Sequence, residues 1–391
     1  MDFGGLTVTV EMAFGDGPFE ASPTWEDVSS YVRAGQIRRG RSSVQSEFPA
    51  GTATLRLGNS DGRFYPWNTS GPYSPDITVG VPVRVTAEYD STTYPVFYGY
   101  VGSNPAPFPT NTEELIQFEC VELVGRLQRK EITRSFSATS SDVRIGALLN
   151  EAGWPAGLRD LGSGVADVAA LETEAESVLD LLRKAVEVEQ GQLFQARDGD
   201  LVFLNRVAPS QGTSQATFGP DGAELIYTDV SVDYDDDYLF NEALITGADL
   251  NEVTVIDATS AGAHGPSTYS SLNEQVPSLP VALNMAEWVV GKYKDVNPRI
   301  EGLTIDPAGD PDNLWPEVLG RELRDIITVE ATYPGSATQL VQEVTVESVS
   351  HDFVAGDVWT VRYGCYPLSD LEQQDFWILG TSELGVSTRL A

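Results

Sequence analysis

Hydrophobic and polar residues alternate along several stretches of the N-terminal third of the chain. Residues 52–57, 81–85 and 96–101 each show this period of two, which is typical of a β-strand with one buried face. Clusters of Asn, Asp, Gly and Pro separate the stretches and indicate turns. Residues 116–123 return to the alternating pattern. The sequence therefore predicts a compact antiparallel unit that ends near position 134.

One long loop within this unit, residues 58–80, is unusually rich in aromatic side chains. It contains Phe64, Tyr65, Trp67 and Tyr73. A solvated polar linker would not carry so many aromatic residues, because their burial is a large source of stability. We therefore expect the loop to pack against another part of the protein.

The middle of the chain changes to a helical pattern. Apolar residues recur at helical spacing in residues 142–153 and more strongly in residues 174–190, where Gly191 is expected to end the helix. Asp198-Gly199 then lies between two short apolar runs, which is a strong hairpin signal. A helix followed by a hairpin is therefore predicted for residues 174–206.

The C-terminal half mixes both patterns. Residues 281–294 predict a helix, and Pro316 fits the first turn of another short helix. Residues 299–305 read as one strand and residues 326–367 as three more. The sequence shows no internal repeat of short period.

The order of these features resembles the hub proteins of siphophage tails, often labelled minor tail proteins in phages of actinobacteria and related to the baseplate hub of contractile-tailed phages. The matching pieces are WEDVSSYV, RRGR, FPAGTATLRLGNSDGRFYPWN, GVPVRV and YPVFYGYV, followed by the helix-plus-hairpin unit and the closing segment DFWILGTSELGVSTRLA. The resemblance covers nearly the whole chain. Many hub proteins continue into long fibre or enzyme extensions, whereas this sequence ends at Ala391.

The resemblance implies a mainly β fold with a small α+β part, in which two β-barrel-like hub domains flank a small helix-plus-hairpin domain. The N-terminal barrel-like domain would span residues 1–135 and the α+β domain residues 136–210. Residues 211–391 would form the second barrel-like domain, with helical insertions and a C-terminal closing segment.

The resemblance also implies a function. Hub proteins form a homotrimer whose six similar barrels match a six-fold ring of distal tail protein or tail tube protein, while three-fold minor tail or tip proteins bind below. The tape measure protein and later the DNA would pass through the central channel. We therefore expect a structural protein of the virion tail tip, assembled in the host cytoplasm. The alternative within structural proteins is the distal tail protein, which forms a six-fold ring.

Composition limits the partners. The 391 residues carry a formal net charge of -34, which argues against specific nucleic-acid binding and against adhesion to anionic lipid, because both need a basic surface. No apolar stretch approaches the ~20 residues of a membrane span, so we expect no membrane insertion by this chain. The charge either keeps the protein soluble or repels DNA while a basic partner docks.

Four arginines stand out against this acidic background: Arg33, Arg38, Arg39 and Arg41. One interpretation is a solvated edge strand, since charges protect sheet edges from aggregation. The other is an inter-subunit contact at which the arginines meet carboxylates of a neighbouring subunit. The sequence leaves both open.

An acidic run contains Asp233, Asp235, Asp236 and Asp237. The alternate spacing of its first members resembles a calcium loop, but Tyr238 stands where an EF-hand needs glycine and Leu244 where it needs glutamate. An EF-hand is therefore excluded. We expect the run to face a partner or to line the channel, where like charge would keep DNA from adhering.

No other motif predicts chemistry, so we expect no cofactor, no metal and no catalytic residue. Cys120 and Cys365 lie in apolar strand-like runs and read as two buried free thiols rather than a disulfide. His264 and His351 are too few for a zinc site. An enzyme acting on cell-wall polymer and a sugar-binding domain remain the alternatives outside the structural class, since glycoside hydrolysis requires only two carboxylates.

Overall fold

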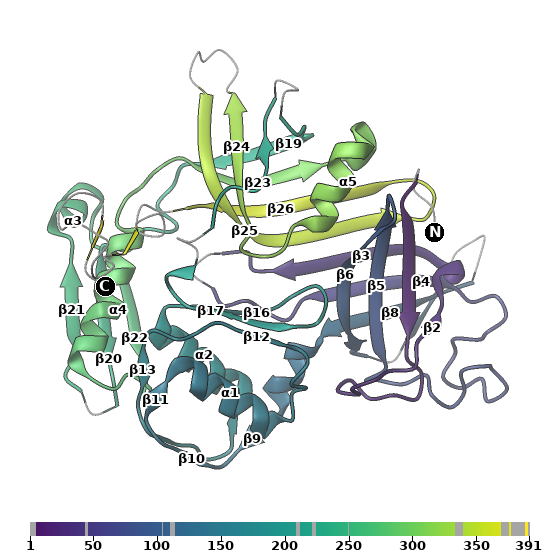
Figure 1. Ribbon diagram of the computed structural model, residues 1–391, viewed down its shortest axis with the longest axis horizontal. Coiled ribbons are helices and arrows are strands. Elements are labelled where there is room, and N and C mark those ends of the chain that lie inside the picture. The colour runs from purple at the N-terminus through teal and green to yellow at the C-terminus, as the bar shows by residue number, and fades with distance from the viewer. Residues whose placement is uncertain are drawn as a thin grey trace.

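The computed structural model describes residues 5–43, 46–103, 105–109, 114–208, 212–220, 224–248, 250–332 and 339–368, together with the short strands β27 (Asp375–Phe376) and β28 (Thr388–Arg389). Four lobes are visible in Figure 1: a β lobe on the right, a second β lobe at the top, a helical lobe at the bottom and a smaller lobe on the left. The expected fold class, mainly β with a small α+β part, is confirmed. Among the described residues, no helix has both the length and the apolar character needed to cross a membrane.

The N-terminal β lobe contains the first strands, β1 to β8, in the spatial order β3-β4-β8-β6-β5-β1-β2, with β7 also paired to β8. Their buried positions alternate with partly exposed ones, as the sequence predicts. The strands are β1 (Thr7–Met12), β2 (Glu26–Asp27), β3 (Val32–Gly40), β4 (Thr52–Gly58), β5 (Pro82–Tyr89), β6 (Thr92–Val101), β7 (Ala106–Pro109) and β8 (Glu114–Glu122).

The C-terminal β lobe continues the same sheet. Strand β25 pairs with β3 from Ser348↔Gly40 to Val354↔Ala34, so the two β lobes share one 14-stranded sheet. The lobe comprises β18 (Thr217–Phe218), β19 (Asp229–Asp233), β23 (Arg299–Ile305), β24 (Ile326–Thr332), β25 (Gln339–Val354), β26 (Trp359–Pro367) and α5 (Pro311–Gly320). One hydrophobic core runs through both β lobes.

The α+β lobe lies below this sheet and carries α1 (Ser141–Ala152), α2 (Val178–Glu189) and a hairpin of β16 (Gln192–Gln195) and β17 (Leu201–Leu204). Leu181 and Leu182 of α2 are fully buried in a second core. Its remaining strands are β9 (Glu131–Ile132), β10 (Ser135–Phe136), β11 (Thr139–Ser140), β12 (Arg159–Leu161), β13 (Asp167–Val168), β14 (Leu171–Glu172) and β15 (Glu176–Ser177).

The inserted lobe consists of α3 (Ala258–His264), α4 (Leu279–Tyr293) and a three-stranded sheet of β20 (Glu242–Thr246), β21 (Val253–Ile256) and β22 (Thr268–Leu272). Residues of α4 and β20 belong to the same core as α1 and α2. This part of the chain therefore packs with the α+β lobe, although it lies within the expected C-terminal domain. Nothing else bears on the expected domain boundaries, which stay predictions.

Local details differ from the sequence predictions at three places. Helix α2 begins at Val178 rather than at residue 174, because Glu176–Ser177 pairs with β9. The left-handed residue that ends α2 is Gln190, with φ 52°, rather than Gly191. Pro311 starts α5 and Pro316 lies inside it.

The aromatic loop packs as expected in part. Phe64 is fully buried and stacks on Tyr73, with ring centroids 5.4 Å apart. Trp67 stacks on Tyr65 but is 64% exposed, so this part of the loop remains at the surface.

Candidate functional site

The arginine run lies at the junction between the two β lobes. Strand β3 has β4 on one side and β25 on the other, so it is an interior strand of the sheet rather than a solvated edge strand. Arg39 and Arg41 point into the protein and are 4% and 8% exposed. Arg38 is exposed and Arg33 is partly buried. Arg39 and Arg41 are therefore committed to contacts within the chain, and an inter-subunit contact stays a prediction that now concerns Arg33 and Arg38.

Arg39 connects three lobes. Its guanidinium pairs with Glu122 of β8 at 2.8 Å and with Glu322, which follows α5, at 2.9 Å. It also donates to the backbone carbonyl of Gln195 on β16 at 2.6 Å. The side chain of Gln195 bonds the N-terminal lobe in turn, at Val124 N–H and the carbonyl of Tyr98. The hairpin of the α+β lobe is thus fixed to both β lobes through one buried cation.

Burial and neighbouring charges have opposite effects on the pKa values of Arg39 and Glu122. Burial alone would lower the pKa of Arg39, but the carboxylates of Glu322 and Glu122 raise it above its ordinary value. Burial raises the pKa of Glu122 to about 7, against the opposing effects of Arg39 and the N–H of Gly51, which donates to Glu122 at 2.7 Å.

Arg41 belongs to a second buried group at the same junction. Its Nε pairs with Glu347 of β25 at 2.7 Å, and Glu347 also pairs with Arg324. Thr345 donates a hydrogen bond of 2.6 Å to the same carboxylate. Burial would raise the pKa of Glu347, but the two arginines outweigh burial and lower it to about 2. The carboxylate is therefore ionised throughout the physiological range.

The partners of the arginines were not predicted from the sequence, although one signal was available. Ile116, Phe118 and Cys120 alternate along β8 with their side chains in the core, and Glu122 continues that parity. Arg39 has the same parity as Ile37 on β3. A charged residue in phase with core residues of its strand must find a buried partner of opposite charge.

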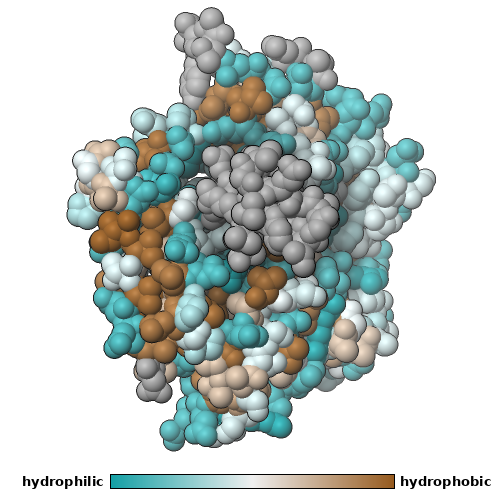
Figure 2. Space-filling model, turned by 60° about the vertical axis from the view of Figure 1, so that its left-hand side comes forward, coloured by the Kyte–Doolittle hydropathy of each residue, from teal (hydrophilic) through white to brown (hydrophobic). Residues whose placement is uncertain are grey.

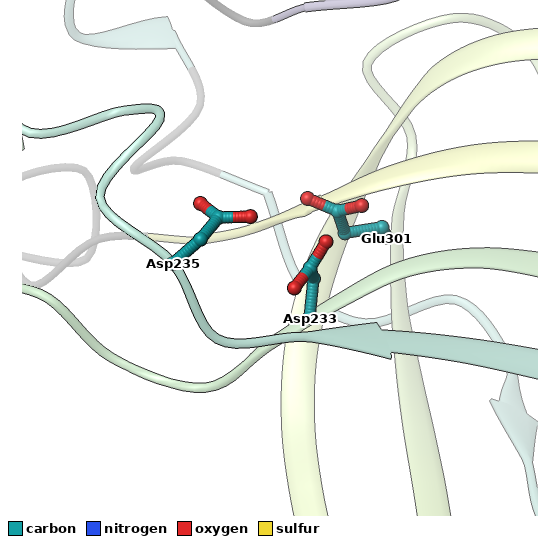
Figure 3. Close-up of side chains that lie close together, drawn as sticks. All are labelled: Asp233, Asp235 and Glu301. Atoms are coloured by element: carbon teal, nitrogen blue, oxygen red, sulfur yellow. The ribbon is translucent and has the colours of Figure 1, made fainter.

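The acidic run lies at the far edge of the sheet, at the end of β19. Asp233, Asp236 and Asp237 are exposed and Asp235 is partly buried. Figure 3 shows Asp233 and Asp235 beside Glu301 of β23. Among the described residues these three carboxylates form the one group with the proximity that a metal ion needs, their oxygen atoms lying within 4.8 Å of one another.

An arginine already forms salt bridges with this acidic group. Arg299 pairs with Asp235 at 2.6 Å and with Glu301 at 3.2 Å. The hydrogen bond from Arg299 is the main reason that the pKa of Asp235 is lowered. A guanidinium in place is a competitor for any cation, so the arrangement indicates a salt-bridged surface loop rather than a metal centre.

Other candidate residues are accounted for within the core. Cys120 and Cys365 are buried free thiols, as predicted, and burial raises the pKa of both. His351 on β25 is buried and accepts a hydrogen bond from the indole N–H of Trp359. Burial lowers the pKa of His351 to about 3, so the ring is neutral.

The inserted lobe contains a long stretch without charged residues. Residues 258–273 contain no Lys, Arg, Asp or Glu, in a chain whose formal net charge is -34. Large hydrophobic residues are exposed within or near this stretch on the same lobe: Ile256, Leu272, Leu279 and Leu283. In Figure 2, which turns this side of the molecule forward, hydrophobic surface covers much of the left of the view. Exposed apolar surface of this kind is typical of protein contacts.

Comparison with known proteins gives the fold. No family model matches the sequence, and no curated protein matches it. Among solved structures, a tail protein from Neisseria meningitidis is 12% identical with a TM-score of 0.60, over 92% of this chain and 96% of that one. The 43 kDa tail protein of prophage MuSo2 from Shewanella oneidensis is 13% identical with a TM-score of 0.59, over 92% and 98%.

A third structure extends the likeness beyond phages. A component of the E. coli type VI secretion system, described as structurally similar to the bacteriophage T4 tail proteins gp27 and gp5, is 9% identical with a TM-score of 0.51, over 93% of this chain and 77% of that one. At such low identities the likeness concerns the fold alone. Nearly the whole chain therefore has the fold of phage tail proteins and of a related secretion-system component.

Proposed function

We propose that this protein is a structural component of a phage tail, and specifically a trimeric hub at the tail tip. The observation that carries the proposal is that the two β lobes form one continuous sheet, in which β3 of one lobe pairs with β25 of the other. Together with the buried arginine groups it fixes the two lobes in one orientation. A ring built from three copies needs that rigidity, because six β lobes can match a six-fold ring only if each pair is held in a constant relation.

The fold likeness over 92% of the chain supports the same function. The uncharged stretch of residues 258–273 supports protein contacts by the inserted lobe, since three copies of a chain with a net charge of -34 repel one another wherever charged surfaces meet. The proposed neighbours are a distal tail protein or tail tube protein above, tip proteins below and the tape measure protein in the channel.

Rotational symmetry tests the proposal. Averaged electron-microscope images of tails carrying a label on this protein should show three copies arranged with three-fold symmetry. Six copies around a six-fold axis would replace the hub with the distal tail protein. A protein that is monomeric and absent from the tail would refute both assignments.

The acidic run provides a second test of the same proposal. We infer that carboxylates outnumber Lys and Arg on the channel wall, because a basic wall would hold DNA through counterion release. The run Asp233 to Asp237 is the first candidate for a position on that wall, and an outward loop that faces a partner is the alternative. A trimer structure in which the channel surface is neutral or net basic would contradict this inference.

We also propose that the protein has no hydrolytic activity. Purified protein incubated with host peptidoglycan should release no soluble fragments. Release that disappears when one carboxylate is replaced would support the cell-wall-degrading alternative instead.

A further inference from the structure

A cavity of about 320 Å³ lies between the α+β lobe, the inserted lobe and residues 46–48. Helix α2 forms one wall and α4 another. Its lining is rich in aromatic side chains, which come from four separate parts of the chain: Phe48, Phe240, Tyr269, Trp288 and Tyr293. Phe240 makes edge-to-face contacts with Tyr269 and Tyr293, so three of the rings hold one another in place.

The charges of the lining are unusual for this protein. Arg41, Arg183 and Lys292 line the cavity together with only two carboxylates, Glu47 and Glu187. The lining is therefore net basic in a chain with a net charge of -34. Glu187 is already occupied, because it accepts hydrogen bonds from Tyr269, Ser271 and Asn273.

Arg41 provides the second, independent observation. Its Nε pairs with Glu347 and its Nη1 donates to the carbonyl of Ser46, but its buried Nη2 has no hydrogen-bond partner among the described residues. A buried guanidinium nitrogen without a partner is costly. Arg41 also lines the cavity, so a small shift of its side chain would present this nitrogen to an anion there, and a carboxylate fits the planar guanidinium especially well.

Arg183 can assist at the mouth of the cavity. It pairs with Glu47 at 2.6 Å, and the Glu47 side chain is 56% exposed, so this carboxylate can move aside. The site therefore combines aromatic walls, one unpartnered buried donor and a second arginine held by a displaceable partner.

We propose that this cavity binds a peptide segment of another polypeptide, one that places a carboxylate beside an aromatic side chain. The aromatic walls receive the ring, and Arg41 and Arg183 receive the carboxylate. The site itself follows from the cavity, whereas the source of the peptide, a neighbouring protein of the tail, rests on the proposed function.

The first experiment tests the site with a small probe. N-acetyl-tryptophan carries an aromatic ring and a carboxylate, and N-acetyl-tryptophanamide is its uncharged match. Calorimetric titration of the full chain should show that the carboxylate binds about tenfold or more tightly than the amide, as expected for hydrogen bonds to a charged group. Equal affinities, or no binding of either probe, would overturn the site.

Two variants localise that binding. Val186→Trp should abolish it, because Val186 lines the cavity and the larger side chain fills it. Arg183→Gln should reduce the preference for the carboxylate over the amide. The matched control is Arg134→Gln, a surface arginine that pairs with Glu151 and does not line the cavity, which should leave binding unchanged. Binding that survives Val186→Trp in a variant with a normal unfolding transition would refute the location.

The second experiment tests the source of the peptide. A photoreactive benzoylphenylalanine in place of Glu47, whose side chain is 56% exposed at the mouth of the cavity and so leaves the interior open, should cross-link, in purified assembled tails, to a segment of another polypeptide that has an acidic residue next to an aromatic one. Cross-links confined to the same chain, or to segments without such a pair, would refute this part. If the small probe binds as expected and the cross-link fails, the site stands and the proposed tail partner does not.

Discussion

The arginine run 33–41 and the aspartate run 233–237 are both short clusters of like charge, yet the structure places them in opposite environments. Arg39 and Arg41 are buried at the junction of the two β lobes, each held by carboxylates from distant parts of the chain. The aspartates lie at the edge of the same sheet, where Asp236 is exposed. A cluster of like charges in the sequence therefore does not predict whether its residues are buried. A better predictor is whether each charged residue alternates in phase with the core residues of its strand.

Loss of Glu347 should have the largest effect of any change considered for this comparison. Glu347→Ala leaves Arg41 and Arg324 buried without their shared carboxylate, and breaking a buried ion pair from one side costs about 3–5 kcal/mol. Urea denaturation of the full chain measures this cost. The control is Arg38→Ala on the same cluster, which should stay within about 0.5 kcal/mol because Arg38 is exposed. If the two substitutions had equal effects, strand parity would not distinguish the buried arginines from the exposed Arg38.

Gly40→Ala should have the next largest effect, because it disturbs the backbone between the two buried arginines. Gly40 has φ +94°, a conformation that residues with a side chain rarely adopt. An added Cβ would also meet the backbone oxygen of Glu347 on the neighbouring strand. Overpacking of this kind typically costs about 1–3 kcal/mol. The free energy of unfolding checks the prediction, with Gly146→Ala as control, since a Cβ added there would have no described atom within 4 Å outside its own helix backbone and chain neighbours.

Much of the local structure could be predicted from the sequence, because period-two and helical patterns are local properties. The strands of the N-terminal lobe, helix α2 and the hairpin after it are close to their predicted places. The pairing of β3 with β25 could not be predicted, because these strands are about 300 residues apart and each has an ordinary alternating pattern. The packing of the inserted lobe with the core of α1 and α2 could not be predicted for the same reason, because the packed segments are far apart in the sequence.

The sequence predicted that the arginines belong to a candidate site, but it did not predict how they are arranged or which residues they contact. The arginines were identified by composition, but their partners Glu122, Glu322 and Glu347 are three of 58 acidic residues and nothing in local spacing distinguishes the last two. The cavity beside Arg41 could not be predicted at all, since its walls come from segments far apart in the chain.

His351 should make the junction sensitive to acid. Its folded pKa of about 3 lies below the ordinary histidine value of 6.5. The folded state therefore binds fewer protons than the unfolded state between these values, and stability falls as the pH is lowered from 6.5 towards 3. In His351→Gln, which cannot be protonated, the difference in unfolding free energy from the wild type should shift in favour of the variant over this window. A difference that does not change with pH would contradict the assignment of a neutral buried ring.

Calcium should have the smallest effect, and this prediction tests the acidic side of the comparison. Asp233, Asp235 and Glu301 are close enough to hold a cation, so a working site would stabilise the folded state in proportion to its occupancy. Arg299, however, already pairs with Asp235 and Glu301. A divalent ion would have to displace this guanidinium, and the repulsion between the two cations at short range would oppose binding. We therefore expect the unfolding temperature to be the same in millimolar Ca²⁺ and in EDTA. A rise with Ca²⁺ that disappears in Asp233→Asn, but persists in Asp236→Asn as the exposed control, would show that the group is a metal site.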